Sequence, residues 1–166
     1  MNDSQRWIES LQLQEHPEGG WFRESYRASE SIPAECLPDR FNGDRCFCTA
    51  IYFLLKGTDF SALHRIRQDE LWHFYDGSPL TIHMIDSAGA YSTVKLGRNI
   101  ESGEALAVVV NAGWLFGATV SDPRSWTLVG CTVAPGFEFA DFEMPGRTQL
   151  LEQYPQHRHV IEQLTR

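Results

Sequence analysis

The sequence has no long apolar run, no excess of basic residues and no closely spaced cysteine pair of the CxxC type. None of its hydrophobic stretches approaches the ~20 residues that a helix needs to cross a bilayer, so we expect no membrane span. Lys and Arg number 14 against 22 Asp and Glu, which gives a net charge of −8. Nucleic-acid binding requires a basic surface that displaces counterions from phosphates, so we expect no nucleic-acid partner.

The cysteines are few and indicate a reducing environment. Cys36, Cys46, Cys48 and Cys131 form no metal-binding or redox motif, and a chain of 166 residues can build its core without disulfides. Cys46 and Cys48 share one face of a predicted strand, where burial as small hydrophobes is favoured over metal binding. The first residues show no basic segment followed by an apolar stretch, so no secretory signal is expected. Together these features predict a cytoplasmic protein.

What remains is an ordinary globular composition, 42% hydrophobic and 22% charged. We expect one domain over residues 1–166, with a barrel core over about residues 21–143. Short β-like runs separated by turn residues predict a β-sandwich or barrel. Clear runs cover residues 46–55, 70–75, 80–85, 105–110, 115–120 and 126–133. Helical spacing predicts a short helix over residues 4–13 and short helical pieces over 149–153 and 157–164.

The most informative segment runs from Gly57 to Gly77. It contains His64, Glu70 and the closing Gly77 at spacings that resemble the first motif of the cupin superfamily. The second histidine of that motif falls on Ile66. A second cupin motif is outlined by Gly103 and Asn-Ala-Gly at 111–113, but its histidine position falls on Phe116. Two of the four usual metal ligands are therefore replaced by apolar residues, and we expect no metal or other cofactor.

The chain is most similar to one branch, the cupin-5 family, over nearly its whole length. This resemblance implies an all-β double-stranded β-helix, the cupin jelly roll, forming a homodimer, with a barrel similar to that of sugar-nucleotide epimerases and isomerases and no established activity. The strings that carry it are His-Pro-Glu-Gly-Gly at 16–20, Trp-Phe-Arg-Glu-Ser-Tyr-Arg at 21–27, His-Arg at 64–65, Asp-Glu-Leu-Trp-His-Phe-Tyr-Asp-Gly at 69–77 and Ala-Pro-Gly-Phe-Glu-Phe at 134–139.

Strand alternation predicts the contents of the barrel. Glu70, Trp72 and Phe74 share one side of a strand, so a carboxylate is expected in an aromatic-walled cavity with His64 nearby. A histidine and a carboxylate placed together suit proton transfer beside a carbonyl group. We predict His64 as the base, Glu70 as its orienter and Tyr26 as a phenolic acid, with Tyr75 as an alternative to Tyr26. The competing interpretation is an inert hydrogen bond between two buried polar groups.

Other residues receive weaker predictions. Arg23 is predicted to bind a substrate carboxylate or phosphate, with a solvated edge strand as the alternative. His83, Glu138 and Asp141 are expected on the outside of the barrel, with completion of a polar cavity as the alternative for Glu138 and Asp141. The full predicted ligand-binding set is Arg23, Trp72, Phe74, Trp114 and Phe116, the last two being equally compatible with plain core packing.

These features leave three functions open. The first is a metal-independent epimerase or isomerase that acts on a small polar, sugar-like molecule by proton transfer. The second is a binding protein that holds a small molecule in the barrel without catalysis, consistent with the reduced ligand set and the aromatic cavity. The third is a metal-dependent cupin enzyme with a reduced ligand set, which is disfavoured because catalytic metal sites typically use three protein ligands.

Overall fold

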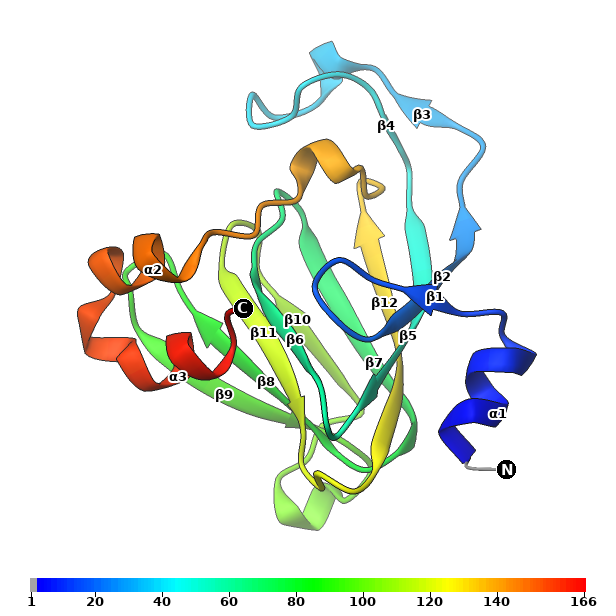
Figure 1. The fold of residues 1–166 in the computed structure, drawn as a ribbon. Helices are drawn as coiled ribbons and strands as arrows, with labels where there is room; N and C mark the ends of the chain where they lie inside the picture. Colours follow the sequence, from blue (N-terminus) through cyan, green and yellow to red (C-terminus); the bar gives the residue numbers. More distant parts are fainter. Residues whose placement is uncertain (1–2) are drawn as a thin grey trace.

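Alternating apolar side chains give most strands one face on a shared core. In β8 (Leu80–Ile85), Leu80, Ile82 and Met84 are buried in the main core, as the period of two in a strand requires. That core combines side chains from two sheets, with Phe53 and Trp72 on one and Ile82 and Phe116 on the other. The computed structural model, which describes residues 3–166, is a barrel of two facing sheets (Figure 1), and these side chains fill its interior.

The larger sheet has six strands, all antiparallel to their neighbours. Its central strand, β12 (Trp126–Ala134), pairs along its length with both β5 (Thr49–Lys56) and β7 (Asp69–Gly77). The order across the sheet is β1 (Gln14–Glu15), β2 (Trp21–Arg27), β5, β12, β7 and β10 (Ala107–Val110).

The smaller sheet has four strands and faces the first across the core. Its order is β6 (Phe60–His64), β11 (Leu115–Val120), β8 and β9 (Tyr91–Leu96). Between β2 and β5 the chain leaves the barrel as an arm, residues 28–48, that contains the short strands β3 (Ser31–Ile32) and β4 (Arg45–Cys46). The arm projects beyond one end of the barrel, close to the segment that follows β12 (Figure 1).

Three short helices lie outside the sheets within residues 3–166: α1 (Asp3–Ser10), α2 (Arg147–Gln153) and α3 (Arg158–Gln163). The helix α1 packs Ile8 against Leu54 and Leu128 on the outside of the large sheet. The C-terminal helices bury Leu150 and Ile161 against Leu63, Ile85 and Leu115 of the small sheet. None of the helices described is long and apolar enough to cross a membrane.

The predicted all-β jelly roll with short terminal helices is confirmed. His83 differs from expectation in its environment. Its side chain does face away from the barrel interior, but it is buried and bonds to the Tyr91 hydroxyl at 2.8 Å and the Thr119 hydroxyl at 3.0 Å. The alternation of β8 correctly predicted which face carries His83, but it could not predict that Tyr91 and Thr119 cover this side chain.

Candidate functional site

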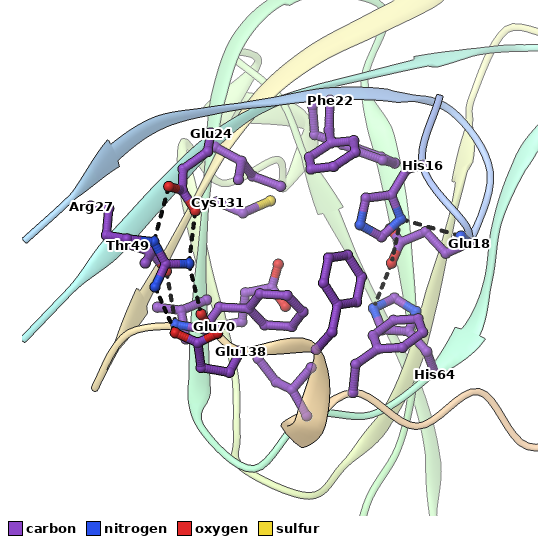
Figure 2. A pocket seen from close by; sticks show the side chains of 17 residues that line it. His16, Glu18, Phe22, Glu24, Arg27, Thr49, His64, Glu70, Cys131 and Glu138 are labelled. Carbon is purple, nitrogen blue, oxygen red and sulfur yellow. Dashed lines mark hydrogen bonds and ion pairs between the residues drawn. The ribbon is translucent and has the colours of Figure 1, made fainter. Parts of the chain in front are cut away.

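A cavity of about 100 Å³ opens at one end of the barrel. It lies where β6 ends at His64, β7 begins near Glu70 and β12 reaches Val133. Figure 2 shows the His16, Glu18 and His64 side chains on one side of the cavity and those of Arg27, Glu24 and Glu138 on the other. The apolar part of the wall is formed by Phe22, Ile51, Phe53, Ile66, Val133, Phe137, Phe139 and Phe142.

The loop 16–20 carries two polar side chains into this cavity. Its turn depends on Gly19 and Gly20, whose φ values of 108° and 75° are disfavoured for residues with a side chain. A Cβ at Gly20 would lie 2.8 Å from the carbonyl oxygen of Leu54, so the loop also requires close backbone contact there. The amide of Ala62 donates to the carbonyl of Glu18 at 2.7 Å and fixes the loop against β6.

Glu18 and His64 form a buried hydrogen-bonded pair. Oε2 of Glu18 lies 3.0 Å from Nε2 of His64, and both side chains are less than a tenth exposed. The hydroxyl of Ser61 donates to Oε1 of Glu18 at 2.8 Å. Nδ1 of His64 lies 2.7 Å from the carbonyl oxygen of Ala62, so both ring nitrogens of His64 are engaged.

The hydrogen-bond partners of Glu18 and His64 indicate where the protons of this pair lie. A carbonyl oxygen can only accept, so Nδ1 of His64 carries the hydrogen that it donates to Ala62. The contact between Nε2 of His64 and Glu18 then needs one further proton, shared between the two groups. Burial raises the pKa of Glu18 and lowers the pKa of His64. Both directions favour a neutral pair, in which protonated Glu18 donates to Nε2 of His64.

His16 covers the pair from the loop. Its Nδ1 accepts a hydrogen bond from the backbone N–H of Glu18 at 3.2 Å, and its ring packs edge-on against Phe22 with centroids 4.5 Å apart. Burial lowers the pKa of His16, although the nearby Glu18 opposes this effect. His16 is therefore a neutral part of the wall that orients the loop around Glu18.

The pKa of Glu70 lies close to neutrality. This residue is buried at the start of β7 and lines the cavity together with Cys131. Burial raises its pKa to about 7, with a smaller contribution from Glu18 in the same direction, while His64 and Cys131 oppose the shift. At neutral pH the carboxyl of Glu70 is thus divided between its acid and base forms, as a general acid–base group requires.

The raised pKa of Glu70 has a consequence for stability. In the unfolded chain this carboxyl titrates near 4.5, so between pH 4.5 and 7 the folded state binds more protons than the unfolded state. Stability is therefore expected to fall by about 3 kcal/mol across that range. The neutral variant Glu70→Gln lacks this loss, and should match the wild type at pH 5 but exceed its melting temperature at pH 8.

Thermal unfolding of both proteins at the two pH values measures this effect, with Glu101→Gln as the control because Glu101 is exposed. A wild type that exceeds the Glu70→Gln variant at pH 8 would contradict the burial of an ionising carboxyl.

Arg27 closes the other side of the cavity. Its guanidinium donates to both carboxylate oxygens of Glu24, at 3.0 and 2.9 Å, and to Glu138 at 2.7 Å. It also donates to the carbonyl oxygen of Phe137 at 3.1 Å, so β2 is tied to the segment after β12. That segment contributes Phe137, Phe139 and Phe142 to the wall.

A β-bulge decides which residues of β2 reach the cavity. The pairing of β2 with β5 shifts register between Glu24 and Tyr26. One extra residue therefore reverses the alternation, so that Arg27 joins Glu24 and Phe22 in the lining, while Tyr26 is exposed on the outside. This corrects the predicted placement of Tyr26 as a cavity acid. Tyr75, the alternative, also does not line the cavity and is half exposed.

The predicted ligand-binding residues also lie outside the cavity lining. Arg23 is exposed and donates to the carbonyl oxygen of Leu11 at 3.0 Å, which ties β2 to the end of α1. Trp72 does share the inward face of β7 with Glu70, but it is deep in the core, where it contacts Phe116 with centroids 6.3 Å apart. The remaining two, Phe74 and Trp114, pack against the same core.

His64 and Glu70 are the predicted residues that the structure brings together at the cavity. Glu138, expected at the surface, also lines it, and Asp141 is fully buried. Sequence reasoning did not assign a role to His16, Glu18, Glu24, Arg27 or Cys131. A signal existed for four of these five, because His16, Glu18, Glu24 and Arg27 fall within the strings that carry the family resemblance, as Glu138 does.

The cavity does not fit a metal ion of the kind that a cupin barrel implies. The two apolar residues at ligand positions are both buried; Ile66 lines the cavity, and Phe116 packs on the ring of His64 with centroids 4.1 Å apart. Within residues 3–166 no three His, Cys, Asp or Glu side chains are grouped as metal ligands. The side chains at the cavity that could ligate a metal include Glu18 and His64, which are already bonded to each other.

Comparisons with known proteins agree with this architecture. Residues 5–145 match the family model Cupin_5, described as cupin superfamily (DUF985). A crystal structure of a protein from Shewanella oneidensis superposes with a TM-score of 0.90 at 37% identity, covering 100% of this chain and 99% of that one. A hypothetical protein from Leishmania major gives a TM-score of 0.87 at 36% identity, covering 97% of each chain.

More distant similarity extends to oxalate decarboxylase from Bacillus subtilis, with a TM-score of 0.56 at 13% identity. The match covers 90% of this chain and 36% of that one. At this identity the likeness concerns the fold alone. No curated protein sequence matches the chain.

Proposed function

The chain belongs to the Cupin_5 family of the cupin superfamily, and because this membership specifies a barrel fold but no reaction, we propose a function from the residues of the cavity. We propose that it is a metal-independent isomerase that moves a proton between neighbouring carbons of a small polar carbonyl compound. The observation that carries this proposal is the carboxyl of Glu70, buried in the same cavity as the hydrogen-bonded Glu18–His64 pair, where burial raises its pKa to about 7.

Glu70 is the group with the right properties for the base. Its pKa near 7 leaves about half of it as carboxylate at neutral pH, and its side chain is buried in a cavity with aromatic walls. His64, by contrast, has both ring nitrogens occupied by Ala62 and Glu18. The geometry therefore favours the reverse of the roles predicted from sequence, with Glu70 as the base and His64 as a positioning residue for Glu18.

The steps follow from these roles. The carboxylate of Glu70 takes a proton from the carbon beside the carbonyl, and the electron pair of that C–H bond moves onto the carbonyl oxygen to give an enolate. The hydrogen bond that Glu18 donates to Nε2 of His64 is exchanged for one to the enolate oxygen, where it stabilises the developing negative charge. Glu70 then returns its proton to the former carbonyl carbon, while the hydroxyl proton on the carbon that lost its hydrogen moves to the oxygen of the former carbonyl. A hydroxy-aldehyde and a hydroxy-ketone are thus interconverted with no change in overall composition.

A shift of a proton along one face fits this cavity better than epimerisation. Epimerisation that removes a proton from one face of a carbon and returns it to the other generally uses a second acid opposite the base. The tyrosines predicted for that role, Tyr26 and Tyr75, do not line the cavity. Glu24 and Glu138 do, but both are engaged by Arg27. A single carboxyl can serve both steps of an isomerisation.

The second candidate is a binding protein without catalysis. The size of the cavity favours it as an alternative, because about 100 Å³ is well below the roughly 300–1,000 Å³ typical of drug-sized ligand sites. Such a cavity admits a small molecule or one end of a larger one. In this case the aromatic wall and the Glu18–His64 pair would serve recognition, and Glu70 would form a hydrogen bond to the bound molecule.

Proton exchange in D₂O separates the two functions without knowledge of the product. Small hydroxy-aldehydes, hydroxy-ketones and sugars are incubated with the protein, and ¹H NMR follows loss of the signal from hydrogen on the carbon beside the carbonyl. Isomerase chemistry predicts enzyme-dependent exchange for at least one compound, retained in the control Glu101→Gln. Binding of one or more compounds, as shown by ligand line broadening, with exchange of none of them would reject the isomerase and support the binding protein.

A further inference from the structure

A second hollow lies beside the cavity and differs from it in charge. It is a cleft of about 680 Å³ that shares Ile66 and Phe142 with the cavity as a common wall. The tip of the arm contributes Arg40, and the connection between β6 and β7 contributes Arg65 and Arg67. Three arginines thus meet at one place on a chain whose net charge is −8. Arg40 precedes Arg65 by 25 residues, so the sequence alone shows no basic cluster.

Arg40 and Arg67 are linked by hydrogen bonds from the side chain of each to the backbone carbonyl of the other. Nε of Arg40 donates to the carbonyl oxygen of Arg67 at 2.8 Å, and Nη1 of Arg67 donates to the carbonyl oxygen of Arg40. Within residues 3–166 the guanidiniums of Arg40 and Arg67 make no other hydrogen bond, so their remaining N–H groups are free to bind a ligand. Two positive charges on the wall of one cleft are stabilised by an anion that lies near both.

The acidic residues of the cleft are already engaged. Glu143 forms a two-bond ion pair with Arg65 at 2.8 and 3.0 Å. Asp141 accepts two hydrogen bonds from Arg45 and one from Gln68. Its distance to Nε of Arg67 is 4.0 Å, at the limit of an ion pair. The charges of Arg40 and Arg67 are therefore the ones left for an external partner.

We propose that Arg40 and Arg67 form a binding site for an anionic group, a phosphate or a carboxylate, on a small molecule. Planar guanidinium groups match the oxygens of both kinds of anion, and two of them lining one cleft can bind different oxygens of one molecule. Ile66 and Phe142 provide apolar surface next to the charges, so the uncharged part of the molecule has a place to pack. This site stands independently of the reaction proposed for the cavity.

Nuclear magnetic resonance of the arginine side chains tests the site directly. Nε–H of Arg40 is bonded to a carbonyl, so its ¹⁵N–¹H signal reports on the cleft. Inorganic phosphate and succinate are titrated separately at constant ionic strength, with chloride as the reference anion. We expect saturable shifts of the Arg40 and Arg67 signals with at least one probe. Saturation by phosphate alone, by succinate alone or by both identifies the anion.

The variants Arg40→Gln and Arg67→Gln are each expected to weaken binding about tenfold through the loss of charge-assisted hydrogen bonds. Arg124→Gln is the matched control, because the Arg124 side chain is 91% exposed and lies outside the cleft. Glu70→Gln should also retain anion binding, which separates failure of this site from failure of the cavity reaction. Shifts that follow chloride without saturating, or equal affinity in Arg40→Gln and the wild type, would overturn the proposal.

Discussion

Glu70→Gln is expected to lower the rate of enzyme-dependent proton exchange by about 10²–10⁴-fold, the usual contribution of a general base. The amide has nearly the same shape as the carboxylate but cannot accept the proton. Because removal of this buried charge is expected to stabilise the fold at pH 8, the lost rate cannot be attributed to unfolding. Exchange measured by ¹H NMR on the best compound of the screen gives the comparison, with Glu101→Gln as the charge-matched control.

The pH dependence of the wild type provides a second test of the same residue. The base form of Glu70 increases as the pH rises through its pKa of about 7, so exchange should increase over that range and then level off. Glu70→Gln should remove this dependence together with the rate. An increase centred near the usual range of an exposed glutamate would show that the acting carboxyl is not the buried one.

His64→Gln separates the two assignments of the base. If His64 only positions Glu18, the variant should retain exchange within about tenfold of the wild type, because Glu70 is intact. If His64 is the base, as the sequence alone suggested, His64→Gln abolishes exchange and Glu70→Gln only weakens it. The order of the two effects therefore decides between the sequence-based and the structure-based roles.

The sequence predicted the barrel well because its strands are specified locally. In β8 the alternation of Leu80, Ile82 and Met84 determines which face is buried, and no distant residue can change that without exposing all three. The family resemblance also carried over, because its strings span most of the chain. The burial of His83 was not predictable, since it depends on Tyr91 and Thr119 of other strands.

The site was predicted only in part because two of its determinants are not local. The bulge between Glu24 and Tyr26 reverses the alternation of β2 and replaces a predicted tyrosine with Arg27 in the cavity. The loop 16–20 reaches across to β6 through the Glu18–Ala62 backbone bond, so the partner of His64 comes from 46 residues earlier in the chain. Neither feature has a signature in residue spacing along a single strand.

The segment that carries the aromatic wall is held by a buried ion pair, and its loss is expected to have the largest effect on stability. Arg45 donates to Asp141 through Nε and Nη2 at 2.7 and 2.6 Å, and the two side chains are 3% and 0% exposed. Although burial alone raises the pKa of Asp141, hydrogen bonds from Arg45 and Gln68 hold it below its usual value. Asp141 ends the turn Phe139–Asp141 and directly precedes Phe142 of the cavity.

Asp141→Ala is expected to cost about 3–5 kcal/mol of unfolding free energy, because it leaves the Arg45 guanidinium buried without its counterion. Glu143→Ala is the matched control: its pair with Arg65 has the same two-bond geometry, but the side chains are 28% and 53% exposed. An exposed pair contributes about 0.2–1 kcal/mol. Urea unfolding of both variants measures the difference. Equal losses of unfolding free energy would show that burial does not explain the contribution of the Arg45–Asp141 pair.

The double variant Arg45→Met with Asp141→Leu identifies the source of that loss. Replacing both charges with apolar side chains of similar size removes the unpaired ion, so most of the stability should return if the cost of Asp141→Ala comes from a stranded charge. The arm residues 42–44 would still lose the bonds that Nη1 of Arg45 donates to their carbonyl oxygens. Stability as low as that of Asp141→Ala would instead assign the loss to those bonds, and would make Arg45 chiefly an anchor for the arm rather than a counterion.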